Sequence, residues 1–412
     1  MGVLKKPKIQ DYWSTDDLFH TPIFSTKECL SRDRFLIILK FLRYSSYPLF
    51  DPSDKTSRIA PLLNFVREVC QEIYIPEKNV SVDESLLLWK GRFLFKQYIP
   101  SKRARFRIKF YELCESSSGY LWNFVMHCGK SDHDQLATFA PPSFKLSARI
   151  VLHLSKNLLD LGYRIVCDNW FSSKKLAEYL ILRKTLMLGT IRVNRGVPKE
   201  LQNEPTSPLN TTFAREGETL WVKHVDKKSS GLRTIYLVDT ESTASVHSTQ
   251  RYRKGGVSED VLKPGSIMEY NKTMNGVDRA DQLIEPYDAT RKTYRWFHKC
   301  AVHFIQRLLL NAFILNNKYN EKKYDLLSFT KLTVTKLLLE TGSGRLRAGV
   351  NRLPRTREQH YLIRIPRTEK KKNPTKRCRV CAQSGTRKES RYMCNACSVA
   401  LCMGDCFPKF HV

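Results

Sequence analysis

Four aspartates occupy positions where their carboxylates could support metal-dependent chemistry. Asp83 lies inside a β-branched run over residues 80–88, and Asp168 directly follows a short apolar run that ends at Cys167. Asp278 and Asp281 are three residues apart, which places them on one face of a helix. Carboxylates on separate elements can hold two divalent cations about 4 Å apart, the arrangement used in phosphoryl transfer between nucleic-acid strands.

Two of these aspartates also have a simpler interpretation. An aspartate at a strand end commonly caps a turn, which would explain Asp168. Asp278 could start a helix, where an acidic side chain is favourable to the dipole. Glu84 is not a further candidate beside Asp83, because adjacent side chains on a strand point to opposite faces.

The last 35 residues hold six of the 12 cysteines and one candidate histidine ligand. Two Cys-x₂-Cys pairs predict zinc, because thiolates at that spacing reach one tetrahedral ion. In a cross-braced arrangement the first site would use Cys378, Cys381, Cys402 and Cys406. The second would use Cys394, Cys397 and His411 and lack a fourth partner. We therefore expect one tight and one weaker Zn²⁺ site.

The elements that would position these residues are helices first, then strands, and then an alternation of helices and strands. Apolar residues at helical spacing predict helices near residues 31–42 and 62–69. A strand meander is predicted over residues 80–88, 92–99, 106–113 and 120–128. Alternation follows, with a helix near 150–158, a strand at 163–167, a helix capped by Ser172 or Ser173 and a strand at 186–191. This order predicts a mixed α/β sheet with helices packed on it.

The later part of the chain has three predicted regions. Residues 193–268 are rich in Ser, Thr, Lys and Gly and contain two predicted strands, 220–225 and 232–238, typical of an insertion. Helices are expected to resume near Gly276 and to include a long apolar helix over 295–316. Residues 341–377 carry a strong excess of basic residues with three prolines, which indicates a basic linker.

Composition points to a polyanionic partner. The chain has 70 Lys and Arg against 40 Asp and Glu, a formal charge of +30. Nucleic acid is the usual partner for such a charge, although a merely soluble basic protein is the alternative. We find no secretory signal, and the most apolar stretch, 304–315, is too short and too polar to span a membrane.

Residues 89–110 combine eight basic residues with six aromatics and no acid. Basic side chains in this segment could follow a phosphate backbone beside the aspartates, namely Lys102, Arg103, Arg105, Arg107 and Lys109. The aromatics have an alternative role as the buried side of the meander.

The sequence resembles the piggyBac transposases and the transposable-element-derived proteins descended from them. The resemblance rests on Val82-Asp83-Glu84 with Lys90-Gly91-Arg92 and the segment 97–102, on Cys167-Asp168-Asn169-Trp170-Phe171, and on Gly276-Val277-Asp278 with Asp281-Gln282. Tyr12-Trp13-Ser14 and Arg32-Asp33-Arg34-Phe35 resemble the helical region that precedes the family's core.

The resemblance implies an RNase H-like core, interrupted by an insertion domain, with a catalytic triad of Asp83, Asp168 and Asp278 and with Asp281 as a fourth carboxylate. It implies Mg²⁺ or Mn²⁺ as cofactor and double-stranded DNA as partner, cut at terminal inverted repeats and joined at TTAA sites. It also implies a homodimer on DNA, with DNA contacts from Arg291, Lys292, Arg295 and Trp296; a buried structural role is the alternative for Trp296.

On this basis the chain divides into a helical region, a two-part core around an insertion, a second helical region, a basic linker and a zinc module. The expected boundaries are 1–79, 80–192, 193–270, 271–290, 291–343, 344–377 and 378–412.

Two further expectations concern the location of the protein in the cell and its role there. The run 370–372 with Lys376 and Arg377 fits a nuclear localisation signal, with a solvated linker as the alternative. Family members have more helical sequence before the segment that here begins at Tyr12. That difference favours a second hypothesis, a domesticated and non-catalytic nuclear DNA-binding or chromatin protein.

Overall fold

The computed structural model describes most of the chain in two compact units. The larger unit comprises Met1–Tyr12 and Asp33–Thr333, and the smaller comprises Trp13–Arg32 and Val334–Val412. The structure describes residues 1–18, 20–25, 29–45, 54, 56–93, 96–98, 106–129, 140–141, 143–228, 231–252, 258–346, 362–368, 371 and 373–411.

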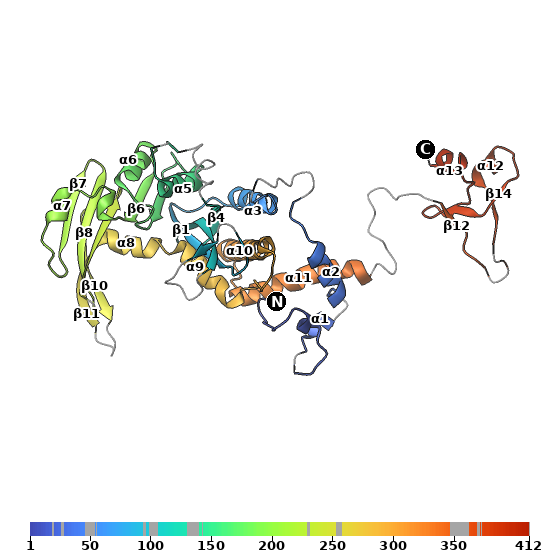
Figure 1. Cartoon of the computed structure of the whole chain (residues 1–412), viewed down its shortest axis with the longest axis horizontal. Coiled ribbons are helices and arrows are strands. Elements are labelled where there is room, and N and C mark those ends of the chain that lie inside the picture. Colours follow the sequence, from blue (N-terminus) through green and yellow to red (C-terminus); the bar gives the residue numbers. More distant parts are fainter. Residues whose placement is uncertain are drawn as a thin grey trace. The chain divides into compact units, whose positions relative to one another are not determined.

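A nine-stranded mixed sheet forms the centre of the larger unit (Figure 1). Its order is β2-β3-β1-β5-β6-β9-β8-β7, and β4 pairs with β3. β1 pairs in parallel with β5, and β5 with β6, whereas the other pairings are antiparallel. The bounds are β1 Asn79–Leu88, β2 Gln97–Tyr98, β3 Phe106–Glu115, β4 Leu121–Met126, β5 Arg164–Cys167, β6 Leu186–Thr190, β7 Thr211–Glu216, β8 Thr219–Lys228 and β9 Gly231–Asp239. The predicted mixed α/β class is confirmed.

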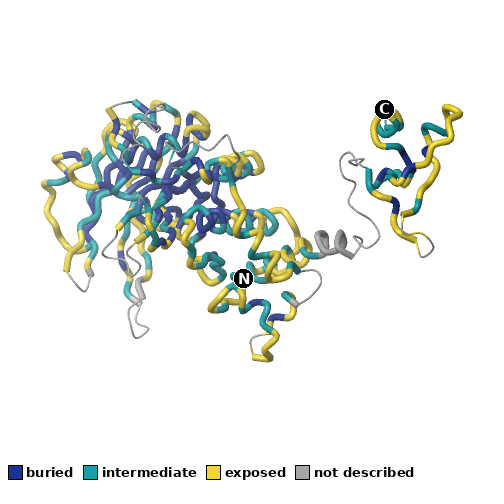
Figure 2. The backbone as a smooth tube through the Cα atoms, turned by 45° about the vertical axis from the view of Figure 1, so that its right-hand side comes forward, coloured by how far each residue is buried: buried dark blue, intermediate teal, exposed yellow. Residues whose placement is uncertain are grey.

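Helices cover both faces of this sheet, and the buried residues gather between the layers (Figure 2). α3 (Ala60–Ile73), α5 (Leu146–Ser155) and α6 (Lys174–Leu182) fall close to the predicted positions. The side chain of Ser173 caps α6 by accepting a hydrogen bond from the backbone N–H of Leu176, so Ser173 is the capping residue of the two predicted. α8 (Gly265–Thr273) and α9 (Gly276–Ile284) precede the long helix α10 (Trp296–Tyr319).

The segment predicted as an insertion is richer in strands than its sequence indicates. Besides the two predicted strands it contains β7, β10 (Val246–Tyr252) and β11 (Ser258–Pro264), together with the short helix α7 (Lys199–Asn203). β9 pairs with β6, so this segment extends the central sheet. Helix α8 starts before Gly276, where helices were expected to resume. The strand expected over 92–99 is reduced, among the described residues, to the two residues of β2.

The start of the chain is anchored on the segment that follows α9. Tyr12 is fully buried, and its hydroxyl donates to the backbone carbonyl of Leu4, at 2.5 Å. Arg291 donates from Nη1 to that hydroxyl, at 3.1 Å, and from Nη2 to the carbonyl of Lys6, at 2.6 Å. α2 (Arg32–Phe41) follows further along the chain.

The smaller unit contains a short helix, the end of a long helix and a cysteine-rich module. The bounds are α1 Pro22–Ser25, α11 Leu326–Leu346, β12 Leu362–Arg364, β13 Lys376–Arg377, α12 Arg379–Gln383, β14 Glu389–Ser390, β15 Tyr392–Cys394 and α13 Cys406–Phe410. Most of the predicted basic linker, with Lys370 and Lys372 of the predicted localisation signal, lies outside the described residues. In the described part of the chain, no helix combines the length and apolarity needed to cross a bilayer.

Candidate active site and metal centres

Asp83 and Asp168 lie at the same edge of the sheet, on neighbouring strands. The parallel pairing of β1 with β5 ends at Val82 and Cys167, so the next residue on each strand is one of the two aspartates. Both fall on the face that carries Ser81 and Val166, because side chains alternate along a strand. Carboxyl ends of parallel strands are where α/β sheets commonly bind ligands.

Helix α9 crosses the same face and brings the third carboxylate to this edge. A Cβ atom at Gly276 would lie 2.3 Å from Ser81 Oγ, so only glycine permits the start of α9 to approach β1 this closely. Further along, Ser85 donates from Oγ to both carboxylate oxygens of Asp281, at 3.2 and 3.4 Å. Asp278 lies between these two contacts on the helix, as Asp83 lies between Ser81 and Ser85 on the strand.

The carboxylates repel one another electrostatically. The pKa of Asp83 is raised to about 7, mainly by burial; the negative charges of Asp168, Glu84 and Asp278 contribute, against one opposing backbone hydrogen bond. Burial also raises the pKa of Asp168, although the backbone N–H groups of Trp170 and Phe171 oppose the shift. The site therefore concentrates more negative charge than nearby protein cations balance.

The donor set fits hard divalent cations. Carboxylate oxygens are the ligands that Mg²⁺ and Mn²⁺ prefer. In the described residues, only the two C-terminal groups bring three or more His, Cys, Asp or Glu ligand atoms within 4.8 Å of one another. The three aspartates do not form such a group, so at least one pair of them has its carboxylate oxygens more than 4.8 Å apart.

Asp168 also caps a turn, which was the alternative role considered for it. Its Oδ1 accepts hydrogen bonds from the backbone N–H of Trp170, at 2.8 Å, and of Phe171, at 3.4 Å. The Trp170 ring then stacks on Tyr111, with 5.7 Å between centroids. This turn fixes the orientation of the carboxylate, so capping and site formation are compatible.

Asp281 is tied into a buried polar network. Arg307 of α10 is fully buried, and its Nη2 donates to Glu112 Oε2, at 2.9 Å, to Ser85 Oγ, at 3.1 Å, and to Asp281. Glu112 faces Asp83 directly across the β1–β3 pairing. Burial alone would raise the pKa of Glu112, but the positive charge of Arg307 reverses the shift and lowers it.

Sequence analysis missed both Glu112 and Arg307 as parts of the site. Arg307 lies in the stretch 304–315, which was considered only as a possible membrane span. A single charged residue inside the apolar stretch 304–315 was the available signal, since a buried cation requires an acidic partner.

The predicted basic residues divide by what they contact. Lys102, Arg103 and Arg105 lie outside the described residues. Arg107 donates to the carbonyl of Leu86, at 3.0 Å, and Lys109 pairs with Glu84, at 2.8 Å, above the Tyr111 and Trp170 rings. Lys109 and Tyr111 lie on the face of the sheet away from Glu112, which is the face that Glu84 occupies. Asp83 lies on the Glu112 face, so Asp83 and Glu84 point to opposite faces, as predicted.

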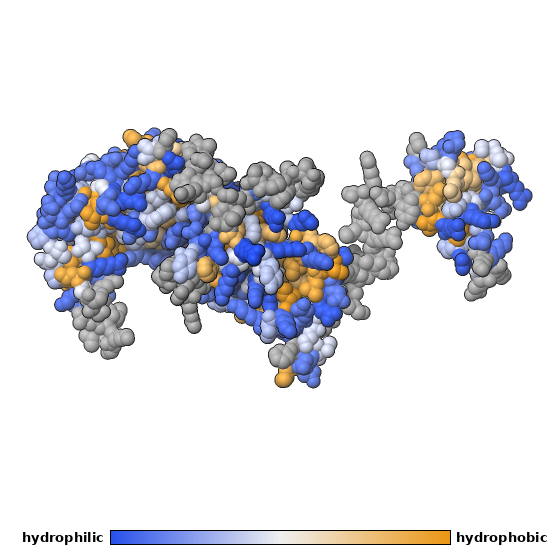
Figure 3. All heavy atoms as spheres, viewed as in Figure 1, coloured by the Kyte–Doolittle hydropathy of each residue, from blue (hydrophilic) through white to orange (hydrophobic). Residues whose placement is uncertain are grey.

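The second predicted basic group surrounds the segment between α9 and α10. Arg291 is engaged by the start of the chain, and Arg295 donates from Nη1 to the carbonyl of Lys40, at 2.7 Å. Trp296 is half-buried, and its ring centroid lies 4.8 Å from that of Phe93. This packing corresponds to the structural role considered for Trp296. Lys292 is exposed. Hydrophilic residues cover much of the face shown in Figure 3.

The cysteine-rich module forms the two predicted ligand groups. One unites Cys378, Cys381, Cys402 and Cys406, and the other unites Cys394, Cys397 and His411. Sulfur atoms bound to one tetrahedral zinc lie about 3.8 Å apart. The Sγ of Cys381 is 4.0 Å from that of Cys402 and 3.6 Å from that of Cys406, which fits this geometry.

Local hydrogen bonds prepare these ligands for metal. Burial alone would raise the pKa of Cys378, but backbone N–H groups of Cys381 and Cys402 outweigh it and lower this pKa to about 7, which favours the thiolate that binds zinc. In the second group Cys397 Sγ lies 3.4 Å from His411 Nε2, and His411 Nδ1 lies 2.8 Å from the carbonyl oxygen of Phe407. A carbonyl at Nδ1 orients the ring so that Nε2 faces the metal.

Two known families match separate parts of the chain, one with the aspartates and the other with the zinc ligands. Residues 1–313 match the family described as Transposase IS4. Residues 355–412 match the family described as a DDE_Tnp_1-like zinc finger. The first match spans the four aspartates and the second spans every cysteine-module ligand.

Individual relatives agree with these families. The PiggyBac transposable element-derived protein 3 of Homo sapiens is 27% identical over all of this chain, which spans 68% of that protein. The PiggyBac transposable element-derived protein 2 of Homo sapiens is 25% identical over 80% of this chain and 56% of its own length. Among solved structures, the piggyBac transposase in a synaptic complex with hairpin DNA matches 95% of this chain and 82% of its own, with a TM-score of 0.67 and 25% identity.

Proposed function

Because the chain belongs to the Transposase IS4 family, within its piggyBac group, we propose that it is a DNA transposase that cleaves and joins strands by metal-dependent phosphoryl transfer. Asp83, Asp168 and Asp278 would hold the metal ions, and Asp281 would keep α9 in place. The substrate would be DNA at terminal inverted repeats, with joining at TTAA sites. The protein would act in the nucleus as a homodimer that holds two DNA ends.

One observation carries this proposal more than any other. Three carboxylates from β1, the end of β5 and α9 lie close enough for the charges of Asp168 and Asp278 to add to the burial that holds the pKa of Asp83 at about 7. Such an excess of negative charge costs folding free energy and is relieved by divalent cations. When bound, these ions would activate the attacking oxygen and stabilise the leaving one.

The remaining residues of the site serve orientation. The N–H groups of Trp170 and Phe171 fix the Asp168 carboxylate, and Ser85 with Arg307 fixes Asp281 one helical turn beyond Asp278. We infer no general base among the histidines, because water or a DNA 3′-hydroxyl is the nucleophile in this chemistry.

The test is strand cleavage of DNA carrying the genomic flanks of the coding sequence, with Mg²⁺ present. Asp168→Asn should abolish cleavage while retaining DNA binding, because the amide loses the charge but can keep its turn contacts. Inverted repeats bordered by TTAA in those flanks would support the proposal before any assay. Binding without cleavage by the unaltered protein, on intact repeats, would contradict it.

A non-catalytic DNA-binding protein is the second candidate, and the zinc module favours it. This module has its own small buried core of Cys378, Cys394 and Leu401. Its exposed basic residues include Lys371, Lys376, Arg377, Arg379, Arg387, Lys388, Arg391 and Lys409. A surface of this kind binds phosphates without any contribution from the aspartates.

A further inference from the structure

Thr190, the last residue of β6, continues the row of side chains that Asp83 and Asp168 begin. The parallel pairing of β5 with β6 ends one residue before Asp168 and one residue before Thr190, so these two residues are neighbours across the strands. Their side chains lie on the same face of the sheet, because side chains alternate in step along paired strands. Adjacent strands are about 4.8 Å apart, so Thr190 is one strand spacing from Asp168 and two from Asp83.

The turn that carries Asp168 lies directly against β6. A Cβ atom at Gly189 would collide with Ser172 Oγ and would lie 2.8 Å from the carbonyl oxygen of Cys167. Ser172 in turn donates from Oγ to the carbonyl oxygen of Asp168, at 2.9 Å. Only glycine permits so close an approach, so the end of β6 belongs to the frame that holds Asp168 in place.

Helix α8 covers this end of β6 on the face of the aspartates. Ile267, Tyr270 and Met274 lie at helical spacing, and they pack in one apolar cluster with Val166 and Leu188 of the sheet. The tyrosine ring is thereby fixed against the sheet, and its hydroxyl is directed to the strand ends. Since α9 covers β1 on the same face, the two consecutive helices flank the row of aspartates.

Two hydroxyl groups meet at the end of β6. The hydroxyl oxygen of Tyr270 lies 3.3 Å from Thr190 Oγ1, and both side chains are half-buried. Among the described residues, neither hydroxyl makes a hydrogen bond besides this one. The pair has two hydroxyl hydrogens, and the bond between them uses one. One O–H group is therefore left to donate to an acceptor that the described residues do not supply.

This hydroxyl pair lies within electrostatic reach of the carboxylates. The pKa of Tyr270 is raised, mainly by burial; the nearby Cys167, Asp168 and Asp83 contribute, against the opposing hydrogen bond with Thr190. The Tyr270 hydroxyl therefore keeps its proton at neutral pH. A protonated hydroxyl fixed beside acidic groups is a neutral donor that can bind an anionic oxygen without competing for the cations.

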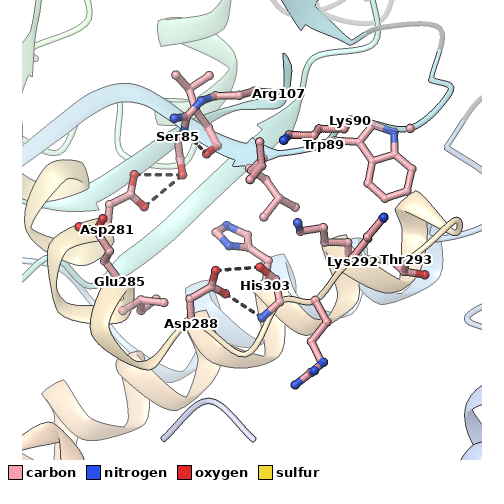
Figure 4. Close-up of a pocket in the computed structure, with 18 of the residues that line it drawn as sticks. Ser85, Trp89, Lys90, Arg107, Asp281, Glu285, Asp288, Lys292, Thr293 and His303 are labelled. Atoms are coloured by element: carbon pink, nitrogen blue, oxygen red, sulfur yellow. Dashed lines mark hydrogen bonds between the residues drawn. The ribbon is translucent and has the colours of Figure 1, made fainter. Parts of the chain in front are cut away.

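The other flank of the site is open. A cavity of about 880 Å³, lined in part by Asp278 and Asp281, extends from α9 past the end of β1, and Ser85 holds the Asp281 carboxylate at its wall (Figure 4). Neither Thr190 nor Tyr270 lines this cavity. The hydroxyl pair thus bounds the row of aspartates on the β6 side, opposite the flank that α9 forms.

We propose that Tyr270 is a further catalytic residue, whose hydroxyl, oriented by Thr190, donates a hydrogen bond to a non-bridging oxygen of the scissile phosphate. The Thr190 hydroxyl then donates to the Tyr270 oxygen, and no proton is transferred. A donor directed at an oxygen where negative charge develops stabilises the transition state. The inference rests on the proposed function, since that function places a DNA phosphate at the aspartates.

The test uses Tyr270→Phe, which removes the hydroxyl and keeps the ring in its apolar cluster. With Mg²⁺, on DNA carrying the genomic flanks, single-turnover cleavage should be at least about tenfold slower than in the unaltered protein. With Ca²⁺ in place of Mg²⁺, the same DNA should bind about fivefold more weakly, with unchanged salt dependence because no charge is lost. Thr190→Val should cause smaller losses in both measurements, because the Tyr270 hydroxyl is still present but no longer oriented.

Sulfur substitution at the scissile phosphate locates the contact. Sulfur accepts hydrogen bonds more weakly than oxygen, and each of the two diastereomers replaces a different non-bridging oxygen. One diastereomer should slow the unaltered protein much more than it slows Tyr270→Phe, whereas the other should slow both proteins equally. A hydroxyl that only stabilised the fold would not produce this dependence on a single oxygen.

Tyr163→Phe is the matched control. Tyr163 is half-buried, and its hydroxyl donates one hydrogen bond, at 3.3 Å, to the carbonyl of Pro76 at the opposite end of β5. It should leave cleavage and DNA binding unchanged, and the two variants should melt within about two degrees of each other. Unaltered cleavage by Tyr270→Phe would overturn the proposal, and so would sulfur effects that are the same in both proteins.

The two proposals fail in different ways. If the unaltered protein cleaves no DNA with Mg²⁺, the transposase proposal fails, and the binding comparison with Ca²⁺ decides by itself whether Tyr270 contacts a DNA phosphate. If the unaltered protein and Tyr270→Phe cleave equally well, only the assignment of Tyr270 fails.

Discussion

Arg307 and Glu112 form an ion pair in which neither side chain reaches solvent, with 2.9 Å between Nη2 and Oε2. The residues belong to α10 and β3, and the pair sits behind Asp83 on the same face of the sheet. Removing Arg307 would leave the Glu112 carboxylate buried without this cation, and removing Glu112 would leave Arg307 with Asp281, whose side chain is partly exposed, as its remaining acidic partner. That loss is costlier than the pair itself is favourable.

The first prediction follows from this asymmetry. Arg307→Met and Glu112→Leu should each lower the free energy of unfolding by about 3–5 kcal/mol. The double variant should recover a large part of that loss, because it buries no unpaired charge at this position. Denaturant unfolding of the metal-free protein measures all four states, and additive losses in the double variant would contradict the prediction.

The second prediction concerns pH and the metal-free site. The pKa of Asp83 in the folded protein is about 7, above its ordinary value of 3.8. A carboxyl group with a raised pKa destabilises the fold progressively as pH rises from the ordinary value to the raised one. Asp83→Asn should therefore raise the melting temperature above pH 7, by on the order of a few degrees, and have no such effect near pH 4.

Asp160→Asn is a control of opposite sign. Hydrogen bonds from Arg183 hold the pKa of Asp160 below its ordinary value, so its charge stabilises the fold at neutral pH. Asparagine also tolerates the left-handed backbone of this residue, where φ is 66°. This variant should lower the melting temperature at pH 7, and the same direction of change in both variants would contradict the electrostatic account.

The third prediction separates Arg291 from its neighbour Lys292. Arg291→Lys keeps the charge but loses the paired contacts with Tyr12 and Lys6, so proteolysis within residues 1–12 should become faster. Lys292→Ala should leave proteolysis unchanged and reduce the salt dependence of DNA affinity by about one phosphate contact. Limited proteolysis and a salt titration of binding distinguish them, and identical behaviour of the two variants would refute the assignment.

Features set by residues close together in the sequence could be predicted, whereas features set by residues far apart in the sequence could not. The two groups of zinc ligands could be predicted because short spacings bring thiolates together, and Asp168 because an apolar strand ends one residue before it. The Arg307–Glu112 pair could not, because its members are 195 residues apart and neither lies in a motif.

The insertion segment was difficult for a different reason. β10 and β11 are rich in Ser, Thr and charged residues, and few of the side chains whose burial is described in them are buried, so the apolar alternation that marks a strand is weak. The pairing of β9 with β6 depends on tertiary contacts and leaves no local pattern.

The last prediction concerns zinc. Four thiolates complete a tetrahedral site, whereas Cys394, Cys397 and His411 supply three ligands, so the chain should bind one zinc tightly and a second more weakly. A graded chelator titration of the folded protein should release zinc in two steps. Cys381→Ser should remove the tight step and unfold the module, since zinc binding and folding are coupled. Cys397→Ser should remove only the weak step, and Cys300→Ala, a buried cysteine on α10, should change neither. A folded protein that contains no zinc, or one that releases both ions in a single step, would contradict this order of affinities.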